Sequence, residues 1–304
     1  MPGPFVPEKI YGIIGHPLAQ TLSPLLHNWG FSRLGVKAAY LAFPTPPERL
    51  EAFVQAVRTL PVSGLSVTIP HKEAVMPFLD RVSDLARRAG AVNTLVWEDG
   101  RLVGHNTDVT GFVAPLLERG FTKGVVPREQ GTGSQLHMCV PAPESALVLG
   151  AGGAAKAVLA GLQDLGIAYI TVSNRHLARA QALAGQFGVR AVAWEESHRV
   201  QARLVVNTTP MGMKGKAEGE SPLPEGFWTP EHLAYDLVYN PRQTLFLRQA
   251  RAAGAEVVDG LAMFAAQGAA QFRLWTGLAL PMEEVEELLA RALGLEERRR
   301  REPG

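Results

Sequence analysis

The sequence has little cysteine: Cys139 is the single one among 304 residues. It cannot form an intramolecular disulfide, and it cannot supply the cysteine cluster of a structural zinc site, so we expect no metal. The chain also lacks an apolar run near the roughly 18 residues that a membrane-spanning helix needs. Its first nine residues contain three prolines instead of the apolar core of a secretory signal. These absences predict a soluble, cytoplasmic protein.

An excess of either charge is missing as well. Thirty basic residues stand against 29 acidic ones, which gives a formal net charge of +1. Such a balance does not point to nucleic acid or to an anionic membrane as a partner. A hydrophobic fraction of 46% argues against wholesale disorder. At roughly 100–200 residues per domain, the length suggests two globular domains.

Short apolar runs alternate with helical patterns in the first half of the chain. Strands are predicted at 9–15, 38–43, 65–69, 91–97 and 101–104, and helices at 23–34, at 46–60 and from residue 70. Ser23 is the expected N-cap of the first helix, with Pro24 at its first helical position. Asp99-Gly100 is a strong hairpin signal. The pattern predicts an α/β domain with a mixed sheet.

The second half repeats strand–helix units, which predicts a parallel doubly wound sheet. Strands are expected at 145–149, 168–173, 189–193, 204–207, 233–237 and 256–258, and helices at 152–165, 177–187, 261–276 and 282–293. Residues 120–144 are rich in Gly, Pro, Thr, Ser and Gln, which indicates a loop or linker. The charge run at 296–301 is typical of a frayed, solvated tail.

A glycine-rich turn joins the first strand and helix of this second half. Gly150 can make the tight turn, Gly152 lets the backbone approach a pyrophosphate, and Ala155 supplies a small residue for helix packing. The helix that follows offers free N–H groups and a positive dipole end to phosphates. A plain glycine turn is the alternative. The strand–turn–helix context favours a dinucleotide site.

The end of the next strand indicates which dinucleotide would bind. An NAD site places Asp or Glu there for the ribose hydroxyls, whereas this chain has Asn174-Arg175-His176. A guanidinium matches a 2′-phosphate by charge and by its planar fork, so Arg175 favours NADP. Arg179, one turn later, fits either a phosphate contact or a solvated helix face.

Polar side chains also follow the strands of the first half, where open α/β sheets bind ligands. Thr21 and Ser23 place two hydroxyls at a helix start, which suits a carboxylate. Lys72 lies in the first turn of a predicted helix, where the dipole disfavours a cation, so its presence needs another reason. Lys72 with Asp108 could handle the proton of an alcohol during hydride transfer. Capping or simple exposure is the alternative for each residue taken alone.

In their order along the chain, these motifs resemble the shikimate dehydrogenase family. They are YGIIGHP at 11–17, SPLLHN at 23–28, GLSVTIPHK at 64–72, AVNT at 91–94, GHNTD at 104–108, the glycine turn, Asn174-Arg175, NTTPMG at 207–212, YDLVYNP at 235–241, Asp259-Gly260, Met263 and Gln267. The resemblance covers most of the chain, and so many motifs in register are highly specific.

The resemblance implies the reversible reduction of 3-dehydroshikimate to shikimate by NADPH, in the pathway to chorismate and the aromatic amino acids. Lys72 and Asp108 match the catalytic pair of the family, and which of them is the formal base stays open. The positions that match substrate-binding residues are Thr21, Ser23, Thr68, Lys72, Asn93, Asp108, Tyr239 and Gln267. The positions that match cofactor-binding residues are Gly150, Ala151, Gly152, Gly153, Ala154, Ala155, Asn174, Arg175, Arg179, Thr208, Met211, Leu237 and Gly260.

The family fold has an N-terminal α/β substrate domain with a mixed, mostly parallel sheet and a Rossmann-type doubly wound NADP domain. The resemblance implies that residues 1–110 and 261–304 form the substrate-binding catalytic domain, because the C-terminal helices return to it. Residues 111–260 would form the NADP domain, with 120–144 as a loop or insertion. The partners expected are small molecules, in a monomer or homodimer.

The chain departs from the family pattern at three positions. Thr21 stands where serine is more common, Val109 replaces the glycine that usually follows the aspartate, and His176 replaces a threonine. Two other functions stay open. A quinate/shikimate dehydrogenase with NAD would be decided at the Thr21 end and at Arg175. A non-catalytic sensor of dinucleotide or shikimate is disfavoured by the intact Lys72.

Overall fold

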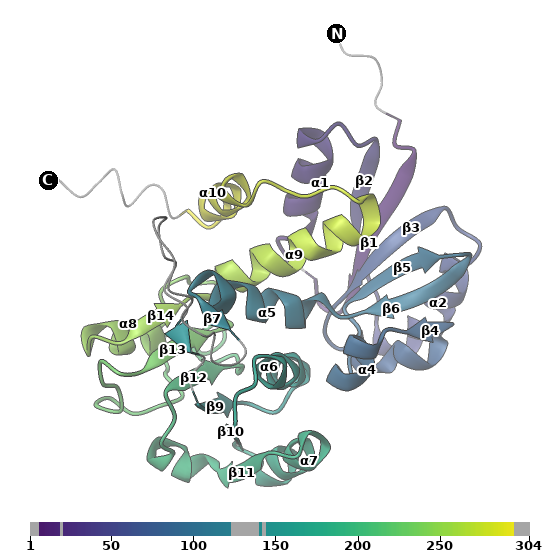
Figure 1. Ribbon diagram of the computed structural model, residues 1–304. Helices are drawn as coiled ribbons and strands as arrows, with labels where there is room; N and C mark the ends of the chain where they lie inside the picture. The colour runs from purple at the N-terminus through teal and green to yellow at the C-terminus, as the bar shows by residue number, and fades with distance from the viewer. Residues whose placement is uncertain (1–5, 19–20, 123–139, 142–143, 295–304) are drawn as a thin grey trace, which may run out of the picture. The chain divides into compact units, whose positions relative to one another are not determined.

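A computed structural model describes residues 6–18, 21–122, 140–141 and 144–294 (Figure 1). The chain divides into two compact units: unit 1 comprises residues 1–108 and 265–304, and unit 2 comprises residues 109–264. The predicted tail at 296–301 and most of the predicted loop at 120–144 lie outside the described residues. Within the described ranges, no helix has both the length and the apolar character needed to span a membrane.

Unit 1 contains the predicted mixed sheet. Its strand order is β2 (Ala38–Pro44), β1 (Lys9–Gly15), β3 (Val62–Val67), β5 (Thr94–Glu98), β6 (Arg101–His105) and β4 (Arg81–Val82). Strand β1 pairs parallel with β2 and β3, whereas β5 runs antiparallel to β3 and β6. The β5–β6 hairpin closes where predicted, because Asp99 and Gly100 both take positive φ, at 50° and 75°.

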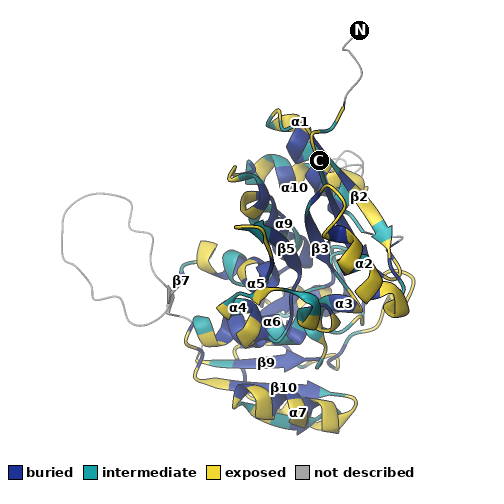
Figure 2. Ribbon diagram, turned by 90° about the vertical axis from the view of Figure 1, so that its right-hand side faces the viewer, coloured by how far each residue is buried: buried dark blue, intermediate teal, exposed yellow. Residues whose placement is uncertain are grey.

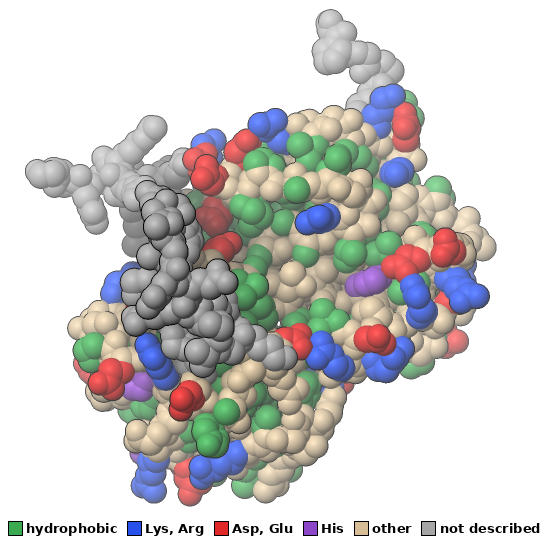
Figure 3. All heavy atoms as spheres, in the orientation of Figure 1, with side chains coloured by type: hydrophobic (Ala, Val, Ile, Leu, Met, Phe, Trp, Pro, Cys, Tyr) green, Lys and Arg blue, Asp and Glu red, His purple; other side chains and the backbone are tan. Residues whose placement is uncertain are grey.

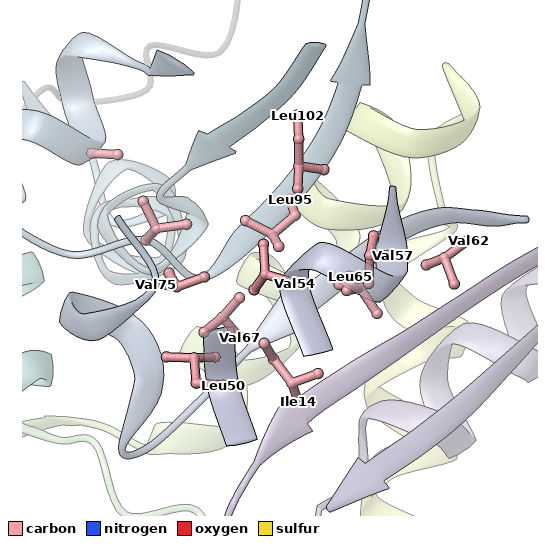
Figure 4. Packing of buried hydrophobic residues seen from close by; sticks show 12 residues of the cluster. Ile14, Leu50, Val54, Val57, Val62, Leu65, Val67, Val75, Leu95 and Leu102 are labelled. Carbon is pink, nitrogen blue, oxygen red and sulfur yellow. The ribbon is translucent and has the colours of Figure 1, made fainter. Parts of the chain in front are cut away.

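Helices cover both faces of the unit 1 sheet. They are α1 (Ser23–Arg33), α2 (Leu50–Val57), α3 (His71–Ala74), α4 (Asp84–Ala89), α9 (Gly260–Thr276) and α10 (Met282–Ala292). On one face, Val54 of α2 packs among Ile14, Leu65 and Leu95 from the strands (Figure 4). On the other face, the Tyr11 ring lies 5.1 Å from that of Trp275 of α9. Unit 1 is therefore a three-layer αβα sandwich.

Four local expectations in unit 1 were wrong, one of them the strand expected at 91–97, which begins at Thr94 and ends at Glu98. Ser23 is not the N-cap of α1, because Leu22 holds that position and the hydroxyl of Thr21 accepts the Ser23 N–H at 3.3 Å. The helix expected at 46–60 is a 3-10 turn, Pro47–Arg49, followed by the shorter α2. The strand expected at 65–69 begins at Val62 and ends at Val67, before the backbone turns into α3.

Unit 2 contains the predicted doubly wound sheet. Its strand order is β11 (Arg190–Ala193), β10 (Tyr169–Asn174), β9 (Ser145–Leu149), β12 (Leu204–Asn207), β13 (Leu233–Asp236) and β14 (Glu256–Val258). Every neighbouring pair is parallel. The order reverses at β9, and a topological switch point of this kind is where open α/β sheets bind ligands.

Helices also flank the unit 2 sheet: α5 (Thr107–Glu118), α6 (Gly153–Asp164), α7 (Leu177–Phe187) and α8 (Leu245–Ala252), with a 3-10 segment at Trp194–Arg199. Gly161 of α6 allows close packing, since a Cβ there would lie 2.8 Å from the Phe112 ring of α5. Phe246 of α8 packs with Leu147 and Val205 of the sheet. Strands β7 (Phe121–Thr122) and β8 (Val140–Pro141) form a separate parallel pair.

Burial and surface charge agree with this layering. Strands such as β5 and β9 are buried along most of their length, whereas α2 and α7 each show an exposed outer side (Figure 2). On the face shown in Figure 3, basic and acidic side chains of the described residues are interspersed. Neither sign gathers into an extended patch on that face.

Candidate active site

The centre of the candidate site in unit 1 is an ion pair between two segments that are far apart in sequence. Lys72 belongs to α3 and Asp108 to the first turn of α5, and Lys72 Nζ lies 2.6 Å from Asp108 Oδ2. The side chains are 19% and 10% exposed, so the pair is largely shielded and still reachable. Helix α3 has only four residues, so its dipole is weak and the ion pair explains the position of Lys72.

Asn93 holds the other side of this carboxylate. Its Nδ2 donates to Asp108 Oδ1 at 2.8 Å and to Thr107 Oγ1 at 2.9 Å. Its Oδ1 accepts the backbone N–H of Thr107 at 2.7 Å and the hydroxyl of Thr94 at 2.8 Å. Both carboxylate oxygens of Asp108 therefore have partners, and the predicted residues Lys72, Asn93 and Asp108 form one connected group.

The predicted hydroxyl pair forms a second polar group in unit 1. Thr21 Oγ1 lies 3.2 Å from Ser23 Oγ, and Ser23 is buried. Ser23 also hydrogen bonds to Tyr40, whose phenol donates to Ser66 Oγ at 2.6 Å. Thr68 is half-buried beyond the end of β3, where its N–H donates to Ile14 at 2.9 Å.

A buried glutamine that sequence reasoning missed connects the two groups. Gln271 Nε2 donates to the Asn93 carbonyl and to Thr94 Oγ1, both at 3.0 Å, and its Oε1 accepts from Ser66 Oγ at 2.8 Å. Gln271 therefore continues a series of hydrogen bonds that runs from Ser66 to the backbone carbonyl of Asn93. It lies one helical turn after the predicted Gln267 on α9, which was the available signal.

Burial sets the protonation of two further members of this series. Desolvation lowers the pKa of His27 to about 3, against the opposing effect of its hydrogen bond to Gln271. The ring is therefore neutral at physiological pH, and its Nε2 donates to Gln271 Oε1 at 3.3 Å. Burial also raises the pKa of Tyr40, so the phenol stays protonated. The hydrogen-bonded series that contains Gln271 is therefore built from neutral groups and is distinct from the ion pair of Lys72 and Asp108.

In unit 2, the glycine turn lies between β9 and α6 and meets the requirements of a phosphate cradle. Gly150 has φ +113°, and a Cβ there would lie 2.4 Å from Thr208 Oγ1, so a side chain is excluded. Gly152 is the N-cap of α6 without a side-chain cap, and a Cβ on Gly152 or Gly153 would meet open space. The first N–H groups of α6 therefore remain accessible to an anion.

The predicted basic residues follow the neighbouring strand β10. Arg175 and His176 come directly after it, Arg179 lies in the first turn of α7, and all three are exposed. Asn174 shapes this turn, since its Nδ2 donates to the His176 carbonyl at 3.1 Å. The arrangement presents two guanidinium groups without an acidic neighbour in the turn, which suits a phosphate.

The remaining predicted residues of unit 2 lie beyond β12, β13 and β14. Thr208 Oγ1 donates to the Leu149 carbonyl at 2.8 Å, and the Leu237 N–H donates to the Asn207 carbonyl at 3.0 Å. Gly260 is tightly placed, because a Cβ there would lie 2.5 Å from the Leu237 carbonyl oxygen. The half-buried Tyr239 packs against Phe264, with ring centroids 5.1 Å apart, and burial raises its pKa. Met211 lies four positions after Asn207, and the side-chain amide of Asn207 donates to the Met211 carbonyl at 3.2 Å.

These features define the class of protein. One unit has a parallel sheet with an open glycine turn, and the other unit has a shielded Lys–Asp pair. The class is that of two-domain α/β proteins with a Rossmann-type dinucleotide unit and a second unit suited to proton chemistry. Three family models match the chain: the shikimate dehydrogenase substrate binding domain at residues 13–95, shikimate / quinate 5-dehydrogenase at 139–207, and the shikimate 5′-dehydrogenase C-terminal domain at 260–290.

Individual relatives cover nearly the whole chain. The shikimate dehydrogenase (NADP(+)) of Oleidesulfovibrio alaskensis is 54% identical over 95% of this chain and 98% of its own length. The chain belongs to the shikimate dehydrogenase family.

Two solved structures show the same architecture. Shikimate 5-dehydrogenase from Thermus thermophilus, in complex with NADP(H) and shikimate, is 42% identical, with a TM-score of 0.79 over 94% of this chain and 100% of that chain. Quinate dehydrogenase from Corynebacterium glutamicum, in complex with NAD, is 32% identical, with a TM-score of 0.82 over 93% of this chain and 99% of that chain. Both matches support the two-domain Rossmann-type fold.

Proposed function

We propose that the chain is an oxidoreductase that reversibly reduces 3-dehydroshikimate to shikimate with NADPH, in the shikimate pathway to chorismate and the aromatic amino acids. The observation that carries the proposal is the Lys72–Asp108 pair with its Asn93 support. It occurs in a chain that is 54% identical to a shikimate dehydrogenase (NADP(+)). In this proposal the substrate-binding domain comprises 1–110 and 261–304, and the NADP domain comprises 111–260.

The proposed roles of Lys72 and Asp108 follow from their contact. An ammonium group 2.6 Å from a carboxylate can hold the reacting oxygen of the substrate and take part in its proton transfer. Asn93 keeps the carboxylate oriented toward the lysine by donating to its other oxygen. NADPH, when bound, supplies the hydride. The pair stabilises the charge that develops on the substrate oxygen and passes the proton that neutralises it.

The other polar groups of unit 1 suit the rest of the substrate. Thr21 and Ser23 offer two hydroxyls for the carboxylate, and Thr68 and Gln267 are proposed to bind ring hydroxyls together with Asn93. Tyr239 of unit 2 is proposed as a further substrate contact. A site built to hydrogen-bond hydroxyls discriminates strongly against analogues that leave its groups unpaired.

The residues of unit 2 fit NADP. The open turn from Gly150 to Ala155 and the uncapped α6 suit the pyrophosphate, and the exposed Arg175 and Arg179 suit a 2′-phosphate. Asn174, Thr208, Met211, Leu237 and Gly260 are the remaining proposed cofactor contacts. The absence of an acidic residue after β10 argues against a preference for NAD, because that residue would hold the ribose hydroxyls.

A second candidate is a quinate/shikimate dehydrogenase that also accepts NAD. It is favoured by the shikimate / quinate 5-dehydrogenase model at residues 139–207 and by the likeness to a quinate dehydrogenase in complex with NAD. Quinate carries an additional hydroxyl beside its carboxylate, so the Thr21–Ser23 end would decide. A non-catalytic sensor is disfavoured by the paired Lys72 and Asp108.

The deciding experiment offers shikimate or quinate to the purified protein with NADP or NAD and follows the absorbance of the reduced cofactor. Rapid reduction with shikimate and NADP alone is expected. Comparable rates with quinate or NAD would replace the first candidate by the second. A folded protein that binds NADPH but turns over none of the four combinations would exclude both enzymes in favour of the sensor.

The cellular location and the oligomeric state are also part of the proposed function. We infer a cytoplasmic enzyme that acts as a monomer or homodimer on small molecules, without a nucleic-acid or membrane partner. Sedimentation analysis checks the assembly, since a tetramer or larger species would contradict it.

A further inference from the structure

Asp236, at the end of β13, is a buried carboxyl group to which the proposed function gives no role. It is 0% exposed. Its Oδ1 accepts from Asn207 Nδ2 at 2.9 Å and from the Val238 N–H at 3.0 Å, and its Oδ2 lies 2.6 Å from the hydroxyl of Thr244. A buried carboxyl group is costly unless it is fully hydrogen bonded, so this one needs an explanation.

The partners of Asp236 belong to two loops that follow neighbouring strands. Asn207 ends β12, and its side chain holds the first loop by accepting the Thr209 N–H at 3.0 Å and donating to the Met211 carbonyl at 3.2 Å. Val238 belongs to the second loop, which follows β13. Thr244 ends that loop as the N-cap of α8. We call Asn207, Asp236, Val238 and Thr244 the Asp236 clamp.

We propose that Asp236 is a positioning residue for NADP, which fixes the loops after β12 and β13 so that Met211 and Leu237 meet the cofactor together. The inference rests on the proposed function, which places these two residues at the cofactor. Leu237 directly follows Asp236. Its own N–H donates to the Asn207 carbonyl at 3.0 Å, and the next N–H along the chain, that of Val238, donates to Asp236 Oδ1 at 3.0 Å.

The hydrogen-bond chemistry of the clamp also makes its grip depend on protonation. The amide of Asn207 and the backbone of Val238 can only donate, whereas the hydroxyl of Thr244 can donate to a carboxylate or accept from a carboxylic acid. An ionised Asp236 accepts three charge-assisted bonds, but the cost of burying its charge exceeds what these bonds return, so the neutral acid holds the loops more firmly than the carboxylate does.

Burial raises the pKa of Asp236 to about 7, and the nearby carboxylate of Asp259 contributes in the same direction. Asp259 is itself paired with Arg242 of the second loop, at 2.7 Å. The clamp therefore changes its protonation near neutral pH.

The test measures the affinity for NADPH directly, through the fluorescence of the cofactor, with full-length protein at pH 6 and pH 8. Asp236→Ala removes the clamp, and about tenfold weaker binding is expected at both pH values. Asp236→Asn imitates the neutral acid, so it should match the wild type at pH 6 and bind NADPH about threefold more tightly than the ionised wild type at pH 8. Titration of the cofactor phosphate affects all variants alike, so the ratio to wild type isolates Asp236.

The matched control is Ser197→Ala in the same unit. Ser197 is also buried, and its substitution removes one hydrogen bond, from Ser197 Oγ to the Trp194 carbonyl at 2.7 Å, which involves neither loop. Its affinity for NADPH should equal that of the wild type. If Ser197→Ala weakens binding as much as Asp236→Ala, or if folded Asp236→Ala binds like the wild type, the proposal is overturned.

Asp236→Asn and the turnover of shikimate provide two further measurements. If Asp236→Ala does not fold, the ratios for Asp236→Asn at the two pH values take its place, and equal affinity to wild type at both would overturn the proposal. Turnover of shikimate is measured in parallel. Clamp-dependent NADPH binding without turnover would refute the proposed function alone, whereas turnover with clamp-independent binding would refute the clamp alone.

Discussion

In both units helices cover the two faces of a sheet, yet burial shifts the pKa of an ionisable side chain in opposite directions in the two units. Unit 1 buries His27, and desolvation lowers the pKa of its ring to about 3. Unit 2 buries Asp236, and desolvation raises the pKa of its carboxyl group to about 7. Burial favours the neutral form in both cases, but neutrality means loss of a proton for histidine and gain of one for aspartate.

His27 and Asp236 therefore contribute to the pH dependence of stability with opposite sign. Unfolded His27 binds a proton below about pH 6.5 and the folded ring does not, so unit 1 loses stability as pH falls from 6.5. Folded Asp236 keeps its proton up to about pH 7 and the unfolded carboxyl group releases it near pH 4, so unit 2 loses stability as pH rises between these values. A burial pattern that looks alike in both units thus has opposite consequences for stability.

The sharpest separation of the units is expected from Lys72→Ala, which removes one charge of the pair in unit 1. We expect kcat for shikimate to fall about 10³-fold, because proton transfer loses its positioned group. The affinity for NADPH, which belongs to unit 2, should stay unchanged. Steady-state kinetics and a fluorescence titration check this, and equal losses in both would refute the assignment of Lys72.

The reverse lesion, Arg175→Asp in unit 2, should weaken NADPH binding about a hundredfold by replacing an attraction to the 2′-phosphate with repulsion. Binding of NADH should change little, so the gap between the cofactors narrows. Titrations with both cofactors measure it, with Arg190→Asp as a control on another strand of the same sheet. An unchanged preference would place the 2′-phosphate elsewhere.

The opposite contributions of His27 and Asp236 to the pH dependence of stability can be removed separately by substitution. Asp236→Asn removes the contribution of Asp236, so the loss of stability that this carboxyl group causes between pH 5 and pH 7, about 2–3 kcal/mol in the wild type, should disappear. Amide hydrogen exchange in β12 and β13 reports the opening free energy of this unit. A wild-type difference that persists in the variant would show that Asp236 is not its source.

The smallest effect is expected from His27→Gln, which keeps a donor for Gln271 but cannot be protonated. Between pH 6.5 and pH 5 the wild type should lose about 2 kcal/mol of unit 1 stability that the variant retains. Hydrogen exchange in α1 and β2 measures this. His198→Gln, in the 3-10 segment of unit 2, serves as control, and an identical slope in all three proteins would contradict the buried, neutral assignment of His27.

Much of the fold could be predicted because its signals are local. The Asp99-Gly100 turn, the six parallel strands of unit 2 and the glycine turn all depend on neighbouring residues, and the structure confirms them. Helices α4, α5 and α8 were missed. Helix α5 contains Pro115, which disfavours a helix interior locally, and burial of Phe112 in the core overrides that preference.

The candidate site was predictable as a set of residues and not as a set of contacts. Lys72, Asn93 and Asp108 came from motifs, and the structure brings these three together. Gln271 lies outside these motifs, and its spacing of one turn from Gln267 was the only local signal, because its partner Asn93 lies 178 positions earlier in the sequence. Asp236 was visible within a motif, but its burial and its three partners emerge only from the packing of β13.

Helix α9 has a consequence for how the protein is made. The ring of Tyr11 on β1 packs against Trp275, which lies 264 positions later in the chain and is therefore synthesised well after it. All six strands of the unit 2 sheet, from Ser145 to Val258, are translated before that aromatic cover exists. Domains generally fold as units during synthesis. The sheet of unit 1 therefore lacks its cover by α9 until the whole sheet of unit 2 has been synthesised.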